Sequence, residues 1–165
     1  MDIIMNNIGS QAGESSASNY FMFRLNAGDS QYFAIDASEI KEIIVAPRLN
    51  KLPGYKGLVE GAFSLRESVV SVVDTCVAIG KRAMSPDDKK FVVVIERDKK
   101  LFGLMAAQVA SIFSKNKSEL LPPPPSLGSR HCITAIFNHH PDGDSKGQGR
   151  LVSVLDTGQI LTSIG

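Results

Sequence analysis

Short apolar runs separated by turn-forming or charged residues follow one another along most of this chain. Two of these runs, residues 69–73 and 91–95, are dominated by β-branched side chains and are too short for typical helices, which indicates buried strands. Other apolar runs of strand length occupy residues 20–25, 31–35, 40–45, 101–105, 109–113, 130–137 and 151–155. The pattern predicts an all-β protein with few short helices.

Helical signals occur at only a few places. Residues 36–39 and 156–159 have the spacing of a capping box, and the apolar positions in residues 160–164 fall on one helical face. We expect one helical turn after the first box and a short final helix after the second. Residues 1–18 are rich in Asn, Ser, Gly and Gln, which predicts a flexible leader before a single domain at residues 19–165.

Arg66 stands alone between the apolar runs at residues 61–65 and 68–73. A hairpin over this segment places Arg66 at the turn and Asp74 at the far end of the returning strand. The planar five-donor guanidinium suits carboxylate and backbone partners, so Arg66 is the leading candidate for recognition. The alternative is a solvated rim residue or a structural ion pair. Asp74 is expected to hold its strand end through backbone amides or a cation.

The same hairpin makes two further expectations. Val69, Val70, Val72 and Val73 should lie mostly in the core, although strict alternation would expose some of them. Substituting Arg66 by Ala should weaken partner binding more than tenfold and leave the melting temperature nearly unchanged, because an exposed ion pair is worth only about 0–1 kcal/mol.

Composition narrows the function classes. The chain has 165 residues, 43% apolar and 21% charged, with a net charge of +1, which is typical of a globular protein without affinity for nucleic acid. No apolar run is long enough to insert into a membrane, and no signal peptide is visible, so we expect a cytoplasmic protein. Cys76 and Cys132 lack disulfide or metal spacing and are expected to be free and buried.

Catalytic motifs are missing from the sequence. No nucleophile elbow, phosphate-binding loop or dinucleotide fingerprint occurs. The loop at residues 138–149 offers His139, His140, Asp142 and Asp144, but their spacing does not match a calcium loop or a zinc site. We therefore predict a binding protein with no enzymatic activity, cofactor or metal.

Residues 61–74 resemble an apolar-Asn-Leu-Arg-Gly turn followed by a Pro-Val-x-Asp-Leu strand, which is the signature of CheW-like chemotaxis coupling domains. Residues 40–43 are similar to the family's Val-x-Glu-Ile element, and Pro53 and Gly61 stand where the family has its Pro and Gly before the arginine. Residues 91–109 are similar to its later strands. With the opening hairpin and the closing strand and helix, the resemblance covers residues 19–165.

The resemblance implies two five-stranded SH3-like β-barrels that share a hydrophobic interface. It also implies a non-enzymatic adaptor that couples the cytoplasmic tips of chemoreceptors (methyl-accepting chemotaxis proteins) to a CheA-type histidine kinase at membrane-associated receptor arrays. An alternative is a degenerate CheW-like domain that serves as an auxiliary structural or small-molecule-binding module.

The resemblance assigns site residues as well. The receptor-facing residues are Arg66, Glu42, Ile40, Ile43 and Glu67, and the structural residues are Asp74, Gly61 and Gly103. The chain also departs from the family pattern. Glu67 replaces the glycine after the arginine and adds a negative charge there, Ser71 replaces a proline, Thr75 a leucine, and residues 106–107 a Val-Asp pair.

Overall fold

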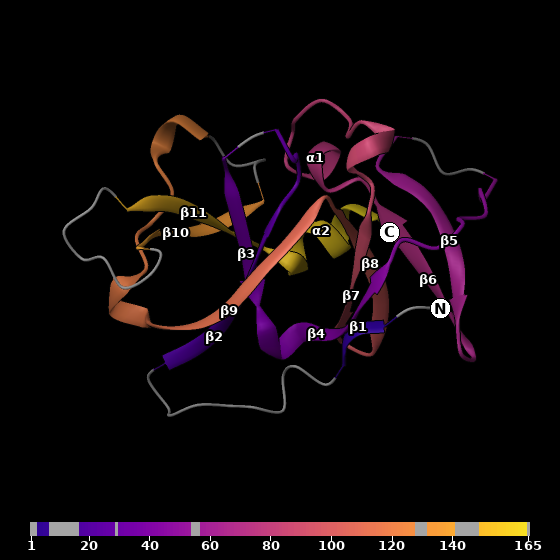
Figure 1. Ribbon diagram of the computed structural model, residues 1–165, viewed down its shortest axis with the longest axis horizontal. Coiled ribbons are helices and arrows are strands. Elements are labelled where there is room, and N and C mark those ends of the chain that lie inside the picture. The colour runs from indigo at the N-terminus through magenta and orange to yellow at the C-terminus, as the bar shows by residue number, and fades with distance from the viewer. Residues whose placement is uncertain are drawn as a thin grey trace.

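Two β-sheets lie side by side in the computed structural model, with a few short helices around them (Figure 1). The structure describes residues 3–6, 17–28, 30–53, 57–127, 132–140 and 149–164. The prediction of an all-β protein with few short helices is confirmed.

The first sheet has six strands in the order β1-β4-β7-β8-β6-β5. Their bounds are β1 Ile3–Asn6, β4 Ile40–Val45, β5 Val59–Leu65, β6 Ser68–Val73, β7 Phe91–Arg97 and β8 Lys100–Ala106. Neighbouring strands are antiparallel except β6 and β8, which run parallel. Hairpins join β5 to β6, as expected for the segment around Arg66, and β7 to β8.

The second sheet has five strands in the order β10-β11-β3-β2-β9. Their bounds are β2 Ala17–Arg24, β3 Tyr32–Asp36, β9 Gln108–Asn116, β10 Ile133–His139 and β11 Arg150–Leu155. Only β11 and β3 pair in parallel. The chain thus crosses from the second sheet to the first after β3 and returns after β8.

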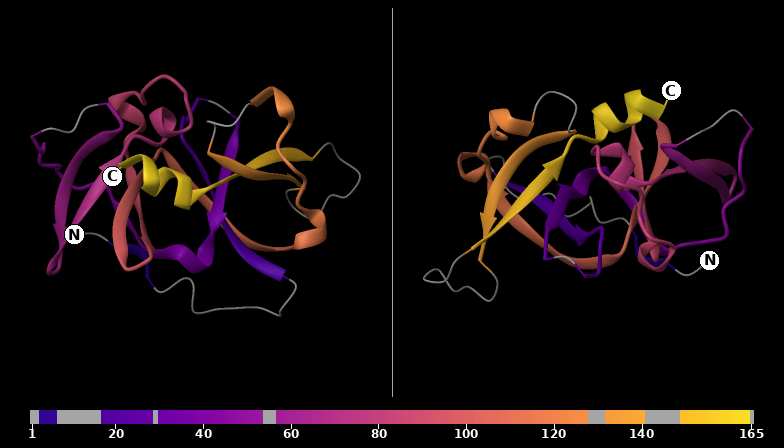
Figure 2. Two further views of the ribbon diagram at one scale, coloured as in Figure 1. Left: turned by 180° about the vertical axis from the view of Figure 1, so that it is seen from behind. Right: turned by 90° about the horizontal axis from the view of Figure 1, so that it is seen from above.

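The described helices are α1 (Thr75–Ala78) and α2 (Thr157–Ile164), together with several single 3₁₀ turns. Both predicted caps are present. The Asp36 carboxylate accepts a hydrogen bond from the Ser38 backbone N–H before the turn at Ala37–Glu39. The Asp156 carboxylate accepts one from the Gln159 N–H at 3.0 Å, in the first turn of α2. Figure 2 shows α2 against the first sheet at the end of the chain.

The main core is shared between the two sheets. Phe21, Phe23 and Ile35 of the second sheet pack in one cluster with side chains of the first sheet, among them Val93 and Leu104. The opposite side chains of the second sheet form a smaller cluster of their own, made of Tyr20, Met22, Ala34, Ala135, Phe137, Val152 and Val154. Because strand side chains alternate between faces, each central strand of this sheet serves both clusters.

The valine-rich strand β6 follows the expected pattern. Val70, Val72 and Val73 are fully buried, whereas Val69 is 66% exposed. Val69 pairs across the hairpin with Ser64, which is also exposed, so this pair faces solvent. The expectation of a mostly buried run is confirmed, with Val69 as the exposed position.

Part of the predicted leader is in strands. Ile3–Asn6 forms β1 along β4, and residues 17 and 18 already belong to β2. The backbone groups on this side of β4 accept the extra strand, and β-branched isoleucines suit it. Residues 7–16 lie outside the described residues. Each sheet therefore has five strands from residue 17 onward, and β1 adds a sixth to the first sheet.

Cys76 and Cys132 are both buried and neither is disulfide-bonded, as predicted. Burial, and after it the nearby Asp156 carboxylate, raises the pKa of the Cys132 thiol. Among the helices that the structure describes, none has the length and apolar character needed to cross a bilayer.

Candidate functional site

The tip of the β5–β6 hairpin is the most distinctive surface feature of the first sheet. Leu65 pairs with Ser68, so Arg66 and Glu67 are the two loop residues. Arg66 has a φ of 54°, in the left-handed region that is costly for a residue other than glycine. The strained conformation falls on the residue that the sequence had singled out, and strain of this kind is often kept where a side chain must be presented.

The Arg66 guanidinium donates a hydrogen bond to the Glu42 carboxylate. The side chain of Glu42 is only 1% exposed, whereas that of Arg66 is 55% exposed. The second carboxylate oxygen of Glu42 has no hydrogen-bond partner among the described residues. A buried carboxylate therefore depends on one arginine that also faces solvent.

This ion pair joins opposite ends of the first sheet. β4 is next to one end of the strand order and β5 forms the other end. A bridge between Asn50 and Ala62 makes a second link, with two backbone hydrogen bonds of 2.8 Å. The sheet thus curves until the β5–β6 hairpin approaches β4 and the chain that follows it, and the Arg66–Glu42 ion pair links the two.

Two glycines permit this packing. A Cβ on Gly61 would lie 2.7 Å from the Asn50 carbonyl oxygen, so the link beside the hairpin requires glycine. A Cβ on Gly103 would lie 2.6 Å from a methyl group of Val92 in the core. Both contacts are closer than ordinary packing allows, which supports the structural role expected for the two glycines.

Most side chains of the element at residues 40–43 are not exposed at the protein surface. Ile40, Glu42 and Ile43 are all buried, because β4 lies inside the sheet between β1 and β7 and its side chains face the shared core. A direct contact of these three side chains with a receptor, as the resemblance implied, is incompatible with this fold. Of the three, Glu42 pairs with Arg66, and the two isoleucines belong to the core.

Asp74 lies at the far end of β6 and is fully buried. One carboxylate oxygen accepts a hydrogen bond from the Val77 N–H at 3.2 Å and caps α1. The other accepts one from the Met84 N–H at 2.9 Å. These backbone amides account for the burial of the charge and support a structural role for Asp74.

Exposed side chains surround the arginine. Glu67, Ser68 and Val69 are all exposed on the same hairpin. Glu67 makes no hydrogen bond or ion pair with the described residues, so the carboxylate that neutralises Arg66 is Glu42 and not its neighbour. The exposed surface of the tip therefore combines a guanidinium, a free carboxylate and one large apolar side chain.

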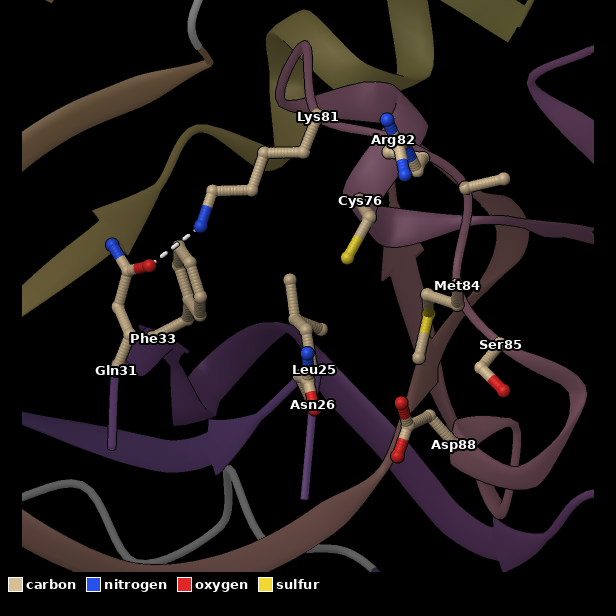
Figure 3. A pocket seen from close by; sticks show the side chains of 11 residues that line it. Leu25, Asn26, Gln31, Phe33, Cys76, Lys81, Arg82, Met84, Ser85 and Asp88 are labelled. Carbon is tan, nitrogen blue, oxygen red and sulfur yellow. Dashed lines mark hydrogen bonds between the residues drawn. The ribbon is translucent and has the colours of Figure 1, made fainter. Parts of the chain in front are cut away.

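A pocket lies beside α1, between the two sheets (Figure 3). One wall comes from the β2–β3 connection, including Leu25, and from Phe33 of β3, and the other wall is α1 and the chain that follows it. The cavity volume is about 440 Å³. No local pattern predicts this pocket, because its two walls are about fifty residues apart in the chain.

The histidine-containing loop offers no assembled metal site in the part of the chain that the structure describes. His131, Asp142 and Asp144 lie outside that part. His139 packs on the Phe113 ring at 5.1 Å between centroids, and burial lowers its pKa, with smaller contributions from Lys115 and His140.

Sequence reasoning missed the pairing of Arg66 with Glu42, which are 24 residues apart. One signal was present. Glu42 is a charged residue within a run of isoleucines, and a carboxylate buried in a strand needs a cationic or hydrogen-bonding partner.

The model of the CheW-like domain family matches residues 19–165. The chain is 22% identical over 152 residues to chemotaxis protein CheW of Klebsiella aerogenes, covering 92% of this chain and 86% of that protein. It is 22% identical over 120 residues to a probable chemotaxis protein CheW of Rhizobium etli, covering 67% of this chain and 77% of that protein. The structure of the scaffolding protein TtCheW from Thermoanaerobacter tengcongensis superposes with a TM-score of 0.69 at 16% identity, covering 84% of this chain and 88% of that one. The chain therefore belongs to the CheW-like domain family.

Proposed function

We propose that this protein is an adaptor that couples the cytoplasmic tips of chemoreceptors to a CheA-type histidine kinase in a bacterial chemosensory array. CheW-like scaffolds carry no enzymatic activity, and the family gives the protein a role in chemotaxis. The proposal adds the two partners and a place of action in the cytoplasm, at membrane-associated receptors.

The observation that carries the receptor side of this proposal is the presentation of Arg66. Its guanidinium donates one hydrogen bond to Glu42, and more than half of the side chain remains exposed. An arginine fork has five donors, so the remaining N–H groups can bind carboxylate or carbonyl groups of a receptor helix tip. The ion pair fixes the fork before binding, which reduces the entropy lost on association.

The Arg66→Lys variant tests this role without removing the charge from beside Glu42. An ammonium group can still pair with the carboxylate, but it cannot offer two parallel hydrogen bonds to a partner. We expect the dissociation constant for a receptor tip fragment to rise more than tenfold, measured by isothermal titration calorimetry. The melting temperature should fall by only a few degrees.

Arg82→Lys is the matched control, because Arg82 is exposed and lies at the α1 side of the molecule, away from the hairpin tip. It should bind the receptor fragment like the unmodified chain.

In a reconstituted mixture, the unmodified protein should change the phosphorylation rate of the kinase in the presence of receptor, and Arg66→Lys should reduce that change. Unchanged receptor binding by Arg66→Lys would contradict the proposal.

Glu67→Gly tests the effect of the charge beside the arginine. Glu67 lies in the hairpin loop next to Arg66 without a partner among the described residues, so its negative charge would repel a receptor carboxylate that approaches the Arg66 guanidinium. Because an exposed pair is worth about 0–1 kcal/mol, we expect receptor affinity to rise by at most about fivefold. A loss of affinity, measured in the same titration, would show instead that Glu67 contacts the receptor favourably.

A further inference from the structure

The pocket between the two sheets has the size and lining of a small-molecule site. Its volume of about 440 Å³ falls within the range of ligand pockets. Leu25, Phe33, Cys76 and Met84 contribute apolar side chains that are otherwise buried in the protein. In Figure 3 the Cys76 sulfur and the end of the Met84 side chain point toward the space beside Leu25. These four side chains make one part of the pocket lining apolar, beside polar residues such as Asn26 and Ser85.

Two cations stand at this pocket without a carboxylate partner. Lys81 and Arg82 line it, and neither forms an ion pair with the described residues. The ion pairs that the structure does describe all engage other cations: Lys41 with Glu96, Arg66 with Glu42, Lys89 with Glu60, and Arg97 with Glu39. The positive charge at the pocket is thus left available to an outside anion.

The position of Lys81 is set by neutral groups. Its ammonium lies 2.5 Å from the Gln31 side-chain oxygen and 5.5 Å from the centroid of the Phe33 ring. Figure 3 shows this side chain extended across the opening toward Gln31 and Phe33. The charge is therefore held directly beside the aromatic wall, where the ring and the amide orient it without neutralising it.

Asp88 limits what the other side of the pocket accepts. Its carboxylate lies near Asn26, away from Lys81 in Figure 3, and accepts a hydrogen bond from the Ala27 N–H at 3.2 Å. A second anionic group on a ligand would approach this carboxylate and be repelled. The pocket is therefore suited to one anionic group, on the side of the Lys81 ammonium and away from Asp88.

We propose that this pocket binds a small organic monoanion, with an apolar or aromatic body against Phe33, Leu25 and Met84 and a carboxylate at Lys81 and Arg82. Charge complementarity selects the anionic end, and the buried lining selects the body. The pocket is separate from the Arg66 hairpin, so the proposal of anion binding does not depend on the proposal of receptor coupling. Because its two walls belong to different sheets, an occupied pocket would link the sheets on this side.

Phenylacetate is a suitable probe, since it consists of an aromatic ring and one carboxylate. We expect a saturable titration in ¹H–¹⁵N NMR spectra of the full chain, with shifts concentrated at the amides of Leu25, Phe33, Cys76 and Met84. 2-Phenylethylamine has the same ring and a similar length but carries a positive charge. It should bind at least tenfold more weakly.

The Lys81→Gln/Arg82→Gln variant should raise the dissociation constant for phenylacetate at least tenfold. Both side chains are exposed, so the variant should fold. Lys99→Gln/Lys100→Gln, at the exposed tip of the β7–β8 hairpin, removes the same charge elsewhere and should bind phenylacetate within twofold of the unmodified chain. Shifts that do not saturate or map elsewhere, equal binding of the amine, or unchanged binding by the first variant would each overturn the proposal.

Discussion

The Val72→Asp variant is expected to be unfolded, or nearly so, at room temperature. Val72 is fully buried in β6, between β5 and β8, and one of its methyl groups faces Gly103. A carboxylate placed there would lose its hydration without gaining a hydrogen-bond partner, which costs several kcal/mol. The whole free energy of unfolding of a domain this size is about 5–15 kcal/mol, so most of it would be lost.

Val69→Asp is the control for this variant, because it makes the same substitution in the same strand. Val69 is 66% exposed, so its aspartate would stay hydrated. We expect its melting temperature, followed by circular dichroism, to lie within a few degrees of the unmodified chain. Equal melting temperatures for Val72→Asp and Val69→Asp would show that β6 does not have the register described above.

Arg66→Ala is expected to destabilise the protein as well as to weaken receptor binding. The substitution leaves the buried carboxylate of Glu42 without its hydrogen-bond donor. An orphaned buried group costs about 1–3 kcal/mol, and more when it is charged. This revises the expectation from the sequence of an unchanged melting temperature, which treated Arg66 as a purely exposed side chain.

A double-mutant cycle isolates this effect. Glu42→Gln keeps the shape of the side chain and removes its charge, so Arg66→Ala/Glu42→Gln should be less destabilised than the sum of the two single variants. For groups in direct contact the coupling is about 0.5–3 kcal/mol. Urea unfolding of the four proteins gives the value. Additive effects of the two substitutions would mean that the ion pair contributes nothing to stability.

The strands were predictable because their signal is local. The β-branched run ending at Val73 and the run of residues 91–95 were identified as buried strands by composition alone, and β6 and β7 occupy those places. The caps at Asp36 and Asp156 were equally visible, since a capping side chain bonds to a backbone group two or three residues away.

The candidate site depends on contacts that no local pattern contains. That Glu42 is buried and reaches Arg66 follows from the curvature of the whole first sheet, which brings β4 toward the β5–β6 hairpin. The pocket at Lys81 likewise needs both sheets to be in place. The left-handed backbone at position 66 is occupied by arginine and not by glycine, so the sequence does not indicate this conformation. Sequence reasoning could thus name the arginine but not the group that holds it.

The short strand β1 covers one backbone edge of β4. It lies before residue 19, where the family match begins, and it pairs along the outer side of β4. Its four residues leave Ile3 and Ile4 nearly half exposed, so backbone hydrogen bonds provide much of its attachment. A chain cut back to residue 19 would expose the N–H and C=O groups of β4 next to Val45, which is 41% exposed. Bare edges of this kind template sheet growth between molecules, and the four-residue β1 replaces the six-residue edge of β4 by a shorter one, which is one way in which natural sheets limit such growth.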